Sequence, residues 1–429
     1  MKNVHIISIG NELLIGDTVN TNASWIGRFL TERGFRVDEV RTISDSYAGI
    51  QQALKYALEH ASLVICTGGI GPTHDDITKK AVAELFSSEM ILNRKVLAHI
   101  KEIFNRRELR FTRSNRDQAM VPDSCEVLFN KKGTAPGMWF QEFGSCLVVL
   151  PGVPFEMKYL MENKVGEKIE RYFTNQEYRA TRYLKTAGVP ESTLSDEVIG
   201  DLSEHLRNGY EVAYLPSPSG VTLRVSSNSK SLQDAEEKLE LLLDYIRQKA
   251  GPLIFGEGRD LMLSETVGNI LAERGLTIGA AESCTGGLIA NSITDIPGSS
   301  RYFPGSIVAY ENRVKTDFLG VSAEDLHGYG AVSKKVALQM AKGICKCLKT
   351  DIGVSATGIA GPGGGTRQKP VGTVWMGFYI NNKHFALKAR FSKDRLINKE
   401  RTVMLILETV RRELLQMDST PYDLKPYSA

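Results

Sequence analysis

Short apolar runs alternate with amphipathic stretches over residues 2 to about 170, and this order limits the folds available to the chain. Apolar runs at 4–9, 35–43 and 63–66 have the length of strands, whereas 22–33 and 46–60 have the length and spacing of helices. This order predicts an α/β fold with a mostly parallel sheet and helices on both faces. Because such sheets bind ligands at the carboxyl ends of their strands, the loops after the apolar runs are the first candidate sites.

Two of these loops contain residues suited to phosphate and metal binding. Glycines let the backbone approach a phosphate, a helix start offers N–H groups, and adjacent aspartates offer hard oxygen ligands for a divalent metal ion. The alternative is purely structural, because a turn followed by a helix cap would use the same residue types. His74 is either a metal ligand or an exposed loop residue. The candidates are Glu12, Asn20 and Asn22 in the first loop, Gly68, Gly69, Gly71 and Thr73 in the second, and Asp75 and Asp76 as metal ligands.

The segment 171–258 changes character. A strand, a helix over 191–206 and a hairpin through Pro216 to Gly220 precede a helix over 234–247. One face of this last helix is apolar. The apolar residues are Leu239, Leu242, Leu243 and Ile246. The pattern predicts a small α+β module.

In the third segment, from about residue 259, an apolar strand over 276–281 runs directly into a helix expected to begin near Thr285. Ser283 at this junction would have an exposed hydroxyl, and the following N–H groups could hold negative charge on an attacked carbonyl oxygen. An N-cap serine would look the same. A possible lysine base, Lys315, and a glycine-rich loop from Thr357 to Gly365 follow in the same segment.

Composition excludes several functional classes. The net charge of +3, from 53 basic and 50 acidic residues, is too balanced to predict nucleic-acid binding by charge. We find no signal-peptide layout and no run near the roughly 18 apolar residues of a membrane span, so we expect a cytoplasmic protein with no membrane association. Six scattered cysteines suggest buried free thiols. The polar, proline-broken residues 418–429 are expected to form a flexible tail.

Several motifs resemble the CinA family (competence/damage-inducible proteins) over nearly the whole chain. They are Ala280 to Gly287, Pro297 to Ser300, Tyr310 to Lys315, Gly330 to Ser333, Thr357 to Pro362 and Lys369 to Val374, with Arg113 to Ala119, Gly133 to Gly137 and Leu150 to Met157 nearer the N-terminus. The resemblance implies an MoCF-like nucleotide- and metal-binding domain at 1–170, a KH-type linker module at 171–258 and a nicotinamide-nucleotide amidase domain at 259–417. The implied enzyme is a bifunctional hydrolase of pyridine-nucleotide salvage.

For the third domain, the resemblance implies deamidation of nicotinamide mononucleotide (NMN) without a cofactor. Ser283 would be the nucleophile and Lys315 the base, which requires a desolvated amine with a lowered pKa; spacing alone fits a surface lysine equally well. Tyr310 would relay or orient the proton and Ser300 would bind the lysine or the leaving ammonia. Glu311 departs from the family pattern and could raise the lysine pKa. The implied substrate-binding residues are Thr285, Gly286, Gly287, Thr357, Gly358, Gly361, Gly363 and Arg395, with Arg401 as an alternative to Arg395.

For the first domain, the resemblance implies metal-dependent hydrolysis of ADP-ribose to AMP and ribose 5-phosphate. Glu12 would be a base or supporting carboxylate, and Asn20 and Asn22 would hold ribose hydroxyls. Two other readings stay open: a molybdopterin-binding or adenylylating protein with an inactive third domain, and a partner protein in competence or DNA repair. The middle module lacks the G-x-x-G loop that KH domains use on nucleic acid, so we expect a spacer or a homodimer contact instead.

Overall fold

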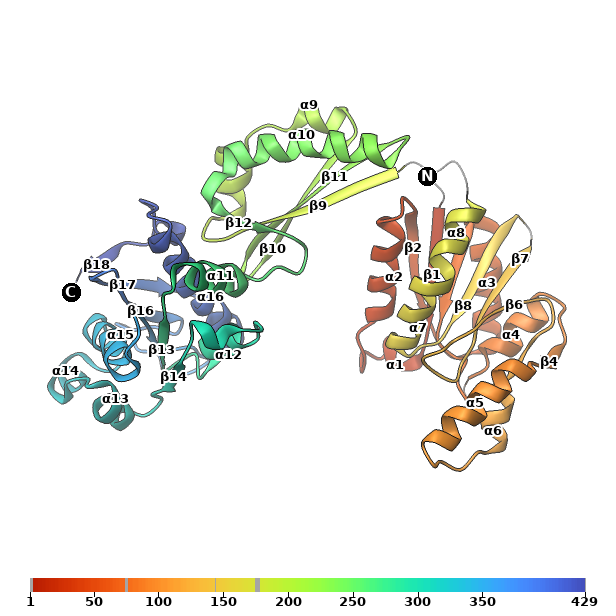
Figure 1. Ribbon diagram of the computed structural model, residues 1–429, viewed down its shortest axis with the longest axis horizontal. Helices are drawn as coiled ribbons and strands as arrows, with labels where there is room; N and C mark the ends of the chain where they lie inside the picture. The colour runs from red at the N-terminus through yellow and green to blue at the C-terminus, as the bar shows by residue number, and fades with distance from the viewer. Residues whose placement is uncertain (1–2, 74–75, 143, 174–177, 429) are drawn as a thin grey trace. The chain divides into compact units, whose positions relative to one another are not determined.

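The computed structural model describes residues 3–73, 76–142, 144–173 and 178–428 (Figure 1). Two compact units divide the chain: 1–180 with 228–236, and 181–227 with 237–429. Among the described residues, no helix is both long and apolar enough to cross a membrane. Each unit is considered by itself.

The first unit is built on a six-stranded sheet. Its central strands are parallel, as the alternation predicts, and two antiparallel strands extend one edge. The order is β2 (Arg36–Ile43), β1 (Asn3–Ile9), β3 (Leu63–Thr67), β8 (Ser145–Leu150), β7 (Gly137–Glu142) and β6 (Glu126–Leu128).

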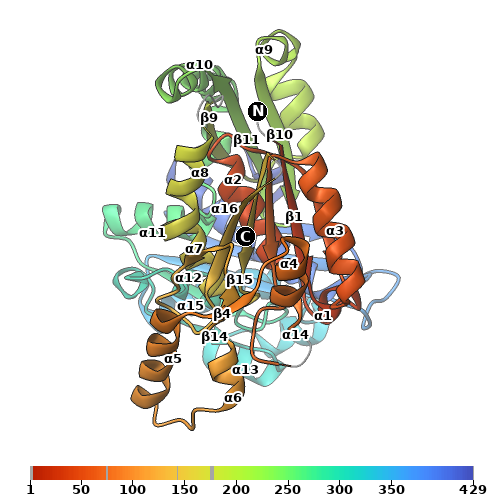
Figure 2. The ribbon, with the colours of Figure 1, turned by 90° about the vertical axis from the view of Figure 1, so that its right-hand side faces the viewer.

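Helices cover both faces of this sheet, and each face has its own apolar core (Figure 2). One face carries α2 (Thr21–Thr31), α7 (Pro154–Leu160) and α8 (Gly166–Tyr172), and the other carries α3 (Tyr47–His60) and α4 (Thr78–Leu85). The short α1 (Asn11–Leu14) follows β1.

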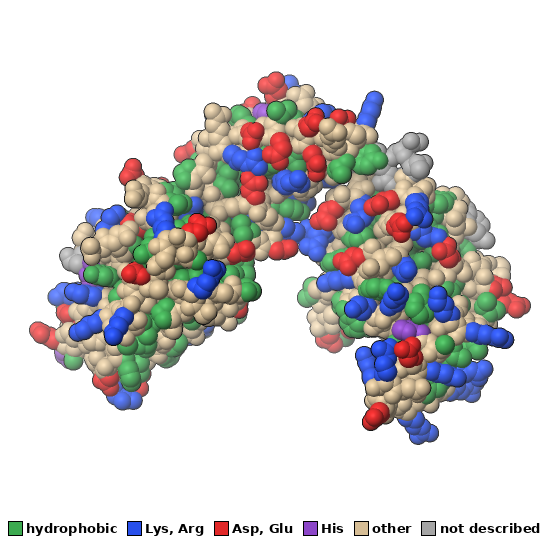
Figure 3. Space-filling view, in the orientation of Figure 1, with side chains coloured by type: hydrophobic (Ala, Val, Ile, Leu, Met, Phe, Trp, Pro, Cys, Tyr) green, Lys and Arg blue, Asp and Glu red, His purple; other side chains and the backbone are tan. Residues whose placement is uncertain are grey.

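A separate lobe of the first unit holds two helices and a two-stranded sheet, on which many Lys and Arg side chains gather (Figure 3). The elements are β4 (Met90–Leu92), α5 (Arg94–Arg106), α6 (Arg113–Asp117) and β5 (Met120–Pro122).

The second unit begins with the α+β module that the sequence predicts. Its four-stranded sheet has the order β10 (Tyr210–Ser217), β11 (Gly220–Ser229), β9 (Tyr178–Thr186) and β12 (Ile254–Glu257). The predicted apolar stripe of α10 (Leu232–Ala250) is confirmed, because its four residues are at most 1% exposed. The single helix expected at 191–206 is instead a π-helical stretch, Thr193–Ile199, followed by α9 (Ser203–Arg207).

The rest of the second unit is a second six-stranded sheet. Strands β14 (Gly305–Val308), β13 (Ile278–Glu282) and β15 (Ile352–Gly358) are parallel, and β16 (Thr373–Ile380), β17 (Lys383–Arg390) and β18 (Pro426–Ser428) extend the sheet in antiparallel pairs.

Helices pack around this sheet. The main core lies with α11 (Leu263–Arg274), α12 (Leu288–Thr294) and α16 (Arg395–Leu414), and a second core lies with α13 (Asn312–Leu319) and α15 (Lys334–Leu348).

Residues 418–428 do not form the flexible tail that we expected. Strand β18 pairs with the edge of β17, with Tyr427 opposite Ala386, and the Tyr427 ring packs edge-on against Trp375. Arg412 donates hydrogen bonds to Ser419 Oγ and to the Thr420 carbonyl oxygen. The expectation is wrong because proline and polar side chains still allow a short edge strand to form.

Candidate active sites

The parallel strands of the second unit bring Ser283 and two candidate loops to one edge. Glu282 pairs with Val308 of β14 and with Ala356 of β15, so β13 and β14 end level with one another and β15 continues to Gly358. The Ser283 N–H donates to the Ala356 carbonyl oxygen (2.9 Å), and the Ala309 N–H donates to the Glu282 carbonyl oxygen (2.7 Å). The loops that carry Tyr310 and Thr357 therefore leave the sheet beside Ser283.

The carboxylate of Glu282 fixes the turn that presents Ser283. This side chain is 0% exposed and accepts hydrogen bonds from the N–H groups of Gly287 (2.9 Å), Ile289 (3.0 Å) and Ala290 (2.8 Å). Helix α12 therefore begins at Leu288, later than expected. The Gly287 amide, which we expected to face a substrate oxygen, is already bonded, and this expectation is corrected.

One hydroxyl in the same turn keeps free hydrogen-bonding capacity. Thr285 is buried, and within the described residues its Oγ1 has no partner. Gly286 and Gly287 both have positive φ angles, 62° and 96°, which glycine tolerates best. A side chain at Gly286 would begin 3.7 Å from Lys399 Nζ of α16. The turn thus stays bare and lies next to a cation that the sequence analysis missed.

Lys315 lies in the interior rather than on the surface. Its side chain is 1% exposed, and Nζ donates to the carbonyl oxygens of Ala309 (2.7 Å) and Tyr310 (3.1 Å). Burial lowers the pKa of Lys315, and the Cys284 thiol nearby acts in the opposite direction. The surface reading, which spacing alone left open, is wrong, and the amine is desolvated as a base would need to be.

Cys284 follows the candidate nucleophile but is unsuited to replace it. Its thiol is buried, and desolvation raises its pKa to about 12, although Arg395 and Lys315 nearby act to lower it. The thiol is therefore protonated at neutral pH, and the thiolate is the reactive form of cysteine.

Arg395 connects two of the candidate loops. Its Nη2 donates to Tyr310 Oη (3.1 Å) and its Nη1 donates to the Gly361 carbonyl oxygen (3.0 Å). Tyr310 is 63% exposed, so its ring borders solvent. The alternative cation, Arg401, lies within electrostatic range of Tyr422 near the C-terminus.

The other candidates of this segment occupy varied positions. Thr357 is buried, and its hydroxyl donates to the Ala331 carbonyl oxygen (2.8 Å). Gly358 ends β15, Gly363 is exposed in the following loop, and Glu311 is the exposed N-cap residue of α13. Ser300 is exposed in a 3-10 turn, Ser299–Arg301. Within the described residues, Lys315 Nζ donates to the backbone oxygens of Ala309 and Tyr310 and not to Ser300.

In the first unit, the predicted loops also lie at the carboxyl edge of parallel strands. Asn22 Nδ2 donates to the Gly152 carbonyl oxygen (2.7 Å), whereas its Oδ1 is buried and has no partner among the described residues. Asn20 caps α2 through the Ala23 N–H and also donates to Thr42 Oγ1, so both ends of its side chain are used within the fold. Glu12 is exposed and folds back over Gly10.

The glycine loop after β3 is shaped by close backbone contacts. Gly68 has φ 107°, and a Cβ there would lie 2.2 Å from the Ile9 carbonyl oxygen, so only glycine fits. Gly69 is also in the left-handed region, and a Cβ on Gly71 would meet Asp76 Oδ2. Within the described residues, the buried hydroxyls of Ser8 and Thr78 at this edge have no partner.

Of the two predicted metal ligands, Asp76 lies within the described residues. Asp76 Oδ2 accepts hydrogen bonds from the N–H (2.9 Å) and the hydroxyl of Thr73, which leaves Oδ1 for an ion. Asp75 and His74 lie outside the described residues, and no group of three His, Cys, Asp or Glu residues among the described ones could hold a metal. One or two carboxylates together with substrate phosphates form a common set for Mg²⁺, so these residues fit such an ion.

The sequence pattern did not single out Lys79, the second residue of α4. It is 6% exposed, Nζ donates to the Gln118 carbonyl oxygen (2.7 Å), and burial lowers its pKa to about 8 although Asp76 nearby raises it. The sequence feature that could have identified Lys79 as a candidate is its position at a helix start after an Asp-Asp pair.

Three family models together match nearly all of the chain. A probable molybdopterin-binding domain matches residues 5–171, the KH domain of damage-inducible protein CinA matches 181–256, and the CinA C-terminal domain matches 260–414.

Similar proteins of known sequence match over almost their full length. A CinA-like protein of Cytophaga hutchinsonii is 41% identical over 412 residues, covering 96% of this chain and 98% of its own. A CinA-like protein of Chloroherpeton thalassium is 43% identical over 418 residues, covering 96% and 98%. A putative competence-damage inducible protein of Clostridium botulinum strain 657 is 41% identical over 409 residues, covering 95% and 99%.

Solved structures match parts of the chain. A CinA protein of Thermoplasma acidophilum is 37% identical with a TM-score of 0.37, covering 39% of this chain and 97% of its own. The molybdopterin biosynthesis enzyme MoaB from Thermus thermophilus is 16% identical with a TM-score of 0.27, covering 40% and 93%. With all three family models and near full-length relatives above 40% identity in agreement, the chain belongs to the CinA family.

Proposed function

We propose that the C-terminal part of this protein hydrolyses the carboxamide of NMN, releasing nicotinate mononucleotide and ammonia. The observation that carries the proposal is the buried Lys315, whose pKa is lowered and which lies beside the turn that presents Ser283. A serine needs such a base to attack an amide. Family membership supports the same assignment.

The chemistry follows from these two groups. Ser283 Oγ attacks the carboxamide carbon while its proton passes to the neutral amine of Lys315, and the tetrahedral intermediate expels ammonia as Lys315 returns the proton. Water then hydrolyses the acyl-serine ester, again with Lys315 as base. The backbone oxygens of Ala309 and Tyr310 hold Nζ in place between these steps.

Two cations are available for the nucleotide phosphate. Arg395 is fixed by its bonds to Tyr310 and Gly361, and Lys399 lies close to Gly286 of the nucleophile turn. Both come from the N-terminal part of α16, where the helix dipole also favours an anion.

The test is ammonia release from NMN. Ser283→Ala and Lys315→Ala should each abolish it, and the double variant should be little worse than either, because groups that act as a unit are strongly non-additive. Hydrolysis of ADP-ribose by the same preparations controls for folding of the other unit. More than about a tenth of the wild-type deamidation rate in Ser283→Ala would contradict the nucleophile assignment.

We further propose that the first unit hydrolyses ADP-ribose with a divalent metal ion. The specific observation is the set of buried oxygens without a partner at the carboxyl edge of its sheet, on Ser8, Asn22 and Thr78. Asp76, with Asp75, would hold the ion, which supplies charge neutralisation and an activated water when bound. The bare Gly68 to Gly71 loop would admit the diphosphate.

EDTA and Asp76→Ala should each abolish release of AMP from ADP-ribose and leave NMN deamidation unchanged. Undiminished hydrolysis in EDTA would exclude the metal mechanism. Titration with molybdopterin tests the alternative reading of this domain, because tight molybdopterin binding without ADP-ribose turnover would favour it.

A further inference from the structure

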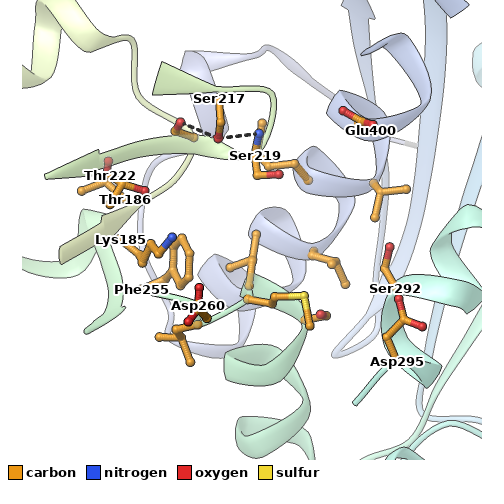
Figure 4. A pocket seen from close by; sticks show the side chains of 18 of the residues that line it. Lys185, Thr186, Ser217, Ser219, Thr222, Phe255, Asp260, Ser292, Asp295 and Glu400 are labelled. Carbon is orange, nitrogen blue, oxygen red and sulfur yellow. Dashed lines mark hydrogen bonds between the residues drawn. The ribbon is translucent and has the colours of Figure 1, made fainter. Parts of the chain in front are cut away.

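A cavity of about 360 Å³ lies within the second unit, between the KH-type sheet and the helices around the six-stranded sheet of that unit (Figure 4). One wall comes from β9 and the β10–β11 turn, and the other comes from α11, α12 and α16. Neither Ser283, Lys315, Tyr310 nor Arg395 lines it. The cavity is therefore distinct from the site proposed for deamidation, and its volume lies within the range of small-molecule sites.

The helical wall of the cavity combines an apolar face with Ser292 of α12 and Glu400 of α16. Val403, Met404 and Leu407 form a continuous face of α16, and Leu288 of α12 and Phe255 of β12 adjoin it. These side chains belong to the main core of the unit, so the wall is fixed by packing rather than by a loop. A surface of this kind suits the ring or chain of a small organic molecule.

Lys185 gives this cavity an unused positive charge. It extends from β9 into the cavity beside Phe255 and Asp260 (Figure 4). The side chain is half-buried and, within the described residues, its ammonium forms no hydrogen bond or ion pair within 4 Å. Desolvation lowers the pKa of Lys185, with Asp260 acting against this effect and Arg259 reinforcing it. A partly desolvated ammonium without an acceptor would gain by meeting an anion.

The two ends of the cavity differ in charge. Lys185 and Arg259 outnumber Asp260 at one end, whereas the acidic side chains Asp295 and Glu400 lie on the side away from Lys185 (Figure 4). A second anionic group on a ligand would face these carboxylates and be repelled. The geometry therefore favours a ligand with one anionic end.

We propose that this cavity binds a small organic anion with an apolar ring or chain, whose single carboxylate or phosphate group contacts Lys185. The inference does not depend on the amidase assignment, because the two sites share no residue. It gives the KH-type module, which lacks the G-x-x-G loop, a role in forming a small-molecule site.

The experiment is a fluorescence titration of the full chain with 8-anilinonaphthalene-1-sulfonate, an anionic aromatic probe. Lys185→Glu should weaken one-site binding at least about tenfold, the loss expected for a charge-assisted hydrogen bond. Thr222→Phe, which puts a ring into the cavity from β11, should also weaken it. Lys238→Glu, on an exposed position of α10, is the matched charge control and should bind like wild type. Thermal unfolding of each variant verifies that it is folded.

Displacement of the probe distinguishes the two anions. Benzoate and phenyl phosphate should both compete with the probe, and the stronger competitor shows whether the cavity prefers a carboxylate or a phosphate. Neutral benzyl alcohol should compete at least about tenfold more weakly. Arg395→Ala should leave the titration unchanged, which separates this cavity from the proposed nucleotide site. The inference is overturned if folded Lys185→Glu and Thr222→Phe bind the probe as wild type does, or if benzyl alcohol competes as well as the anions.

Discussion

Replacing Glu282 by glutamine tests whether its buried carboxylate stabilises the turn that carries Ser283. Oε2 accepts the N–H groups of Gly287 and Ile289, and Oε1 accepts the Ala290 N–H and the Ser306 hydroxyl (3.3 Å). A glutamine has only one carbonyl oxygen. If this oxygen keeps the two bonds of Oε2, its NH₂ group faces the N–H of Ala290, and two donors meet in a site with no exposure.

The magnitude follows from these contacts. Two hydrogen bonds to a carboxylate become bonds to a neutral oxygen, at about 0.5 to 1 kcal/mol each, and one buried N–H loses its acceptor, at about 1 to 3 kcal/mol. We expect the free energy of unfolding to fall by about 3 kcal/mol. Because the turn carries Ser283, the kcat for NMN should fall more than the KM rises.

The assays are urea denaturation, hydrogen exchange at the amides of residues 287–290, and deamidation kinetics. The matched control for unfolding and hydrogen exchange is Glu311→Gln, since that carboxylate is exposed and makes no capping hydrogen bond at the start of α13. An unfolding free energy within about 0.5 kcal/mol of wild type, together with unchanged exchange and unchanged kcat, would refute the reasoning.

Four further outcomes are expected. The rate of NMN deamidation should rise with pH through the lowered pKa of Lys315 and level off below the ordinary lysine pKa, because only the neutral amine accepts a proton. Lys315→Arg should be inactive at every pH of this profile. Iodoacetamide should leave native Cys284 unmodified at pH 8 in peptide mass mapping, because its thiol is buried with a pKa of about 12. Glu408→Gln should cost about 3 to 5 kcal/mol in urea denaturation, because it leaves the buried guanidinium groups of Arg411 and Arg412 without their carboxylate. Light scattering at micromolar concentration should give the mass of a homodimer, and a monomer mass would contradict that prediction.

The sequence predicted the position of Ser283 because an apolar run and a glycine pair mark a strand end and a turn without reference to the rest of the chain. The burial of Lys315 followed only from the family resemblance, since a lysine at a helix start looks the same when it is exposed. Asn20 resembled a ligand because a helix cap and a ribose contact need the same amide group.

Other features could not be predicted because they depend on contacts between distant segments. Lys399 reaches Gly286 only once α16 has packed against α12, and the cavity at Lys185 requires the KH-type sheet to meet α12 and α16. Glu282 lies within an apolar strand, and nothing in that strand indicates that its carboxylate will turn towards the amides of α12.

The pairing of β18 with β17 bears on how fragments of this chain would behave. The match to the CinA C-terminal domain ends at residue 414, which is a natural place to shorten the chain. Such a fragment would remove Ser419 and Thr420 from the guanidinium of Arg412 and would leave β17, with Phe385 and Leu387 on it, as an unprotected sheet edge. Open edges with apolar side chains pair with one another between molecules. Aggregation of a fragment cut at residue 414 would therefore reflect a missing strand and not an unstable core.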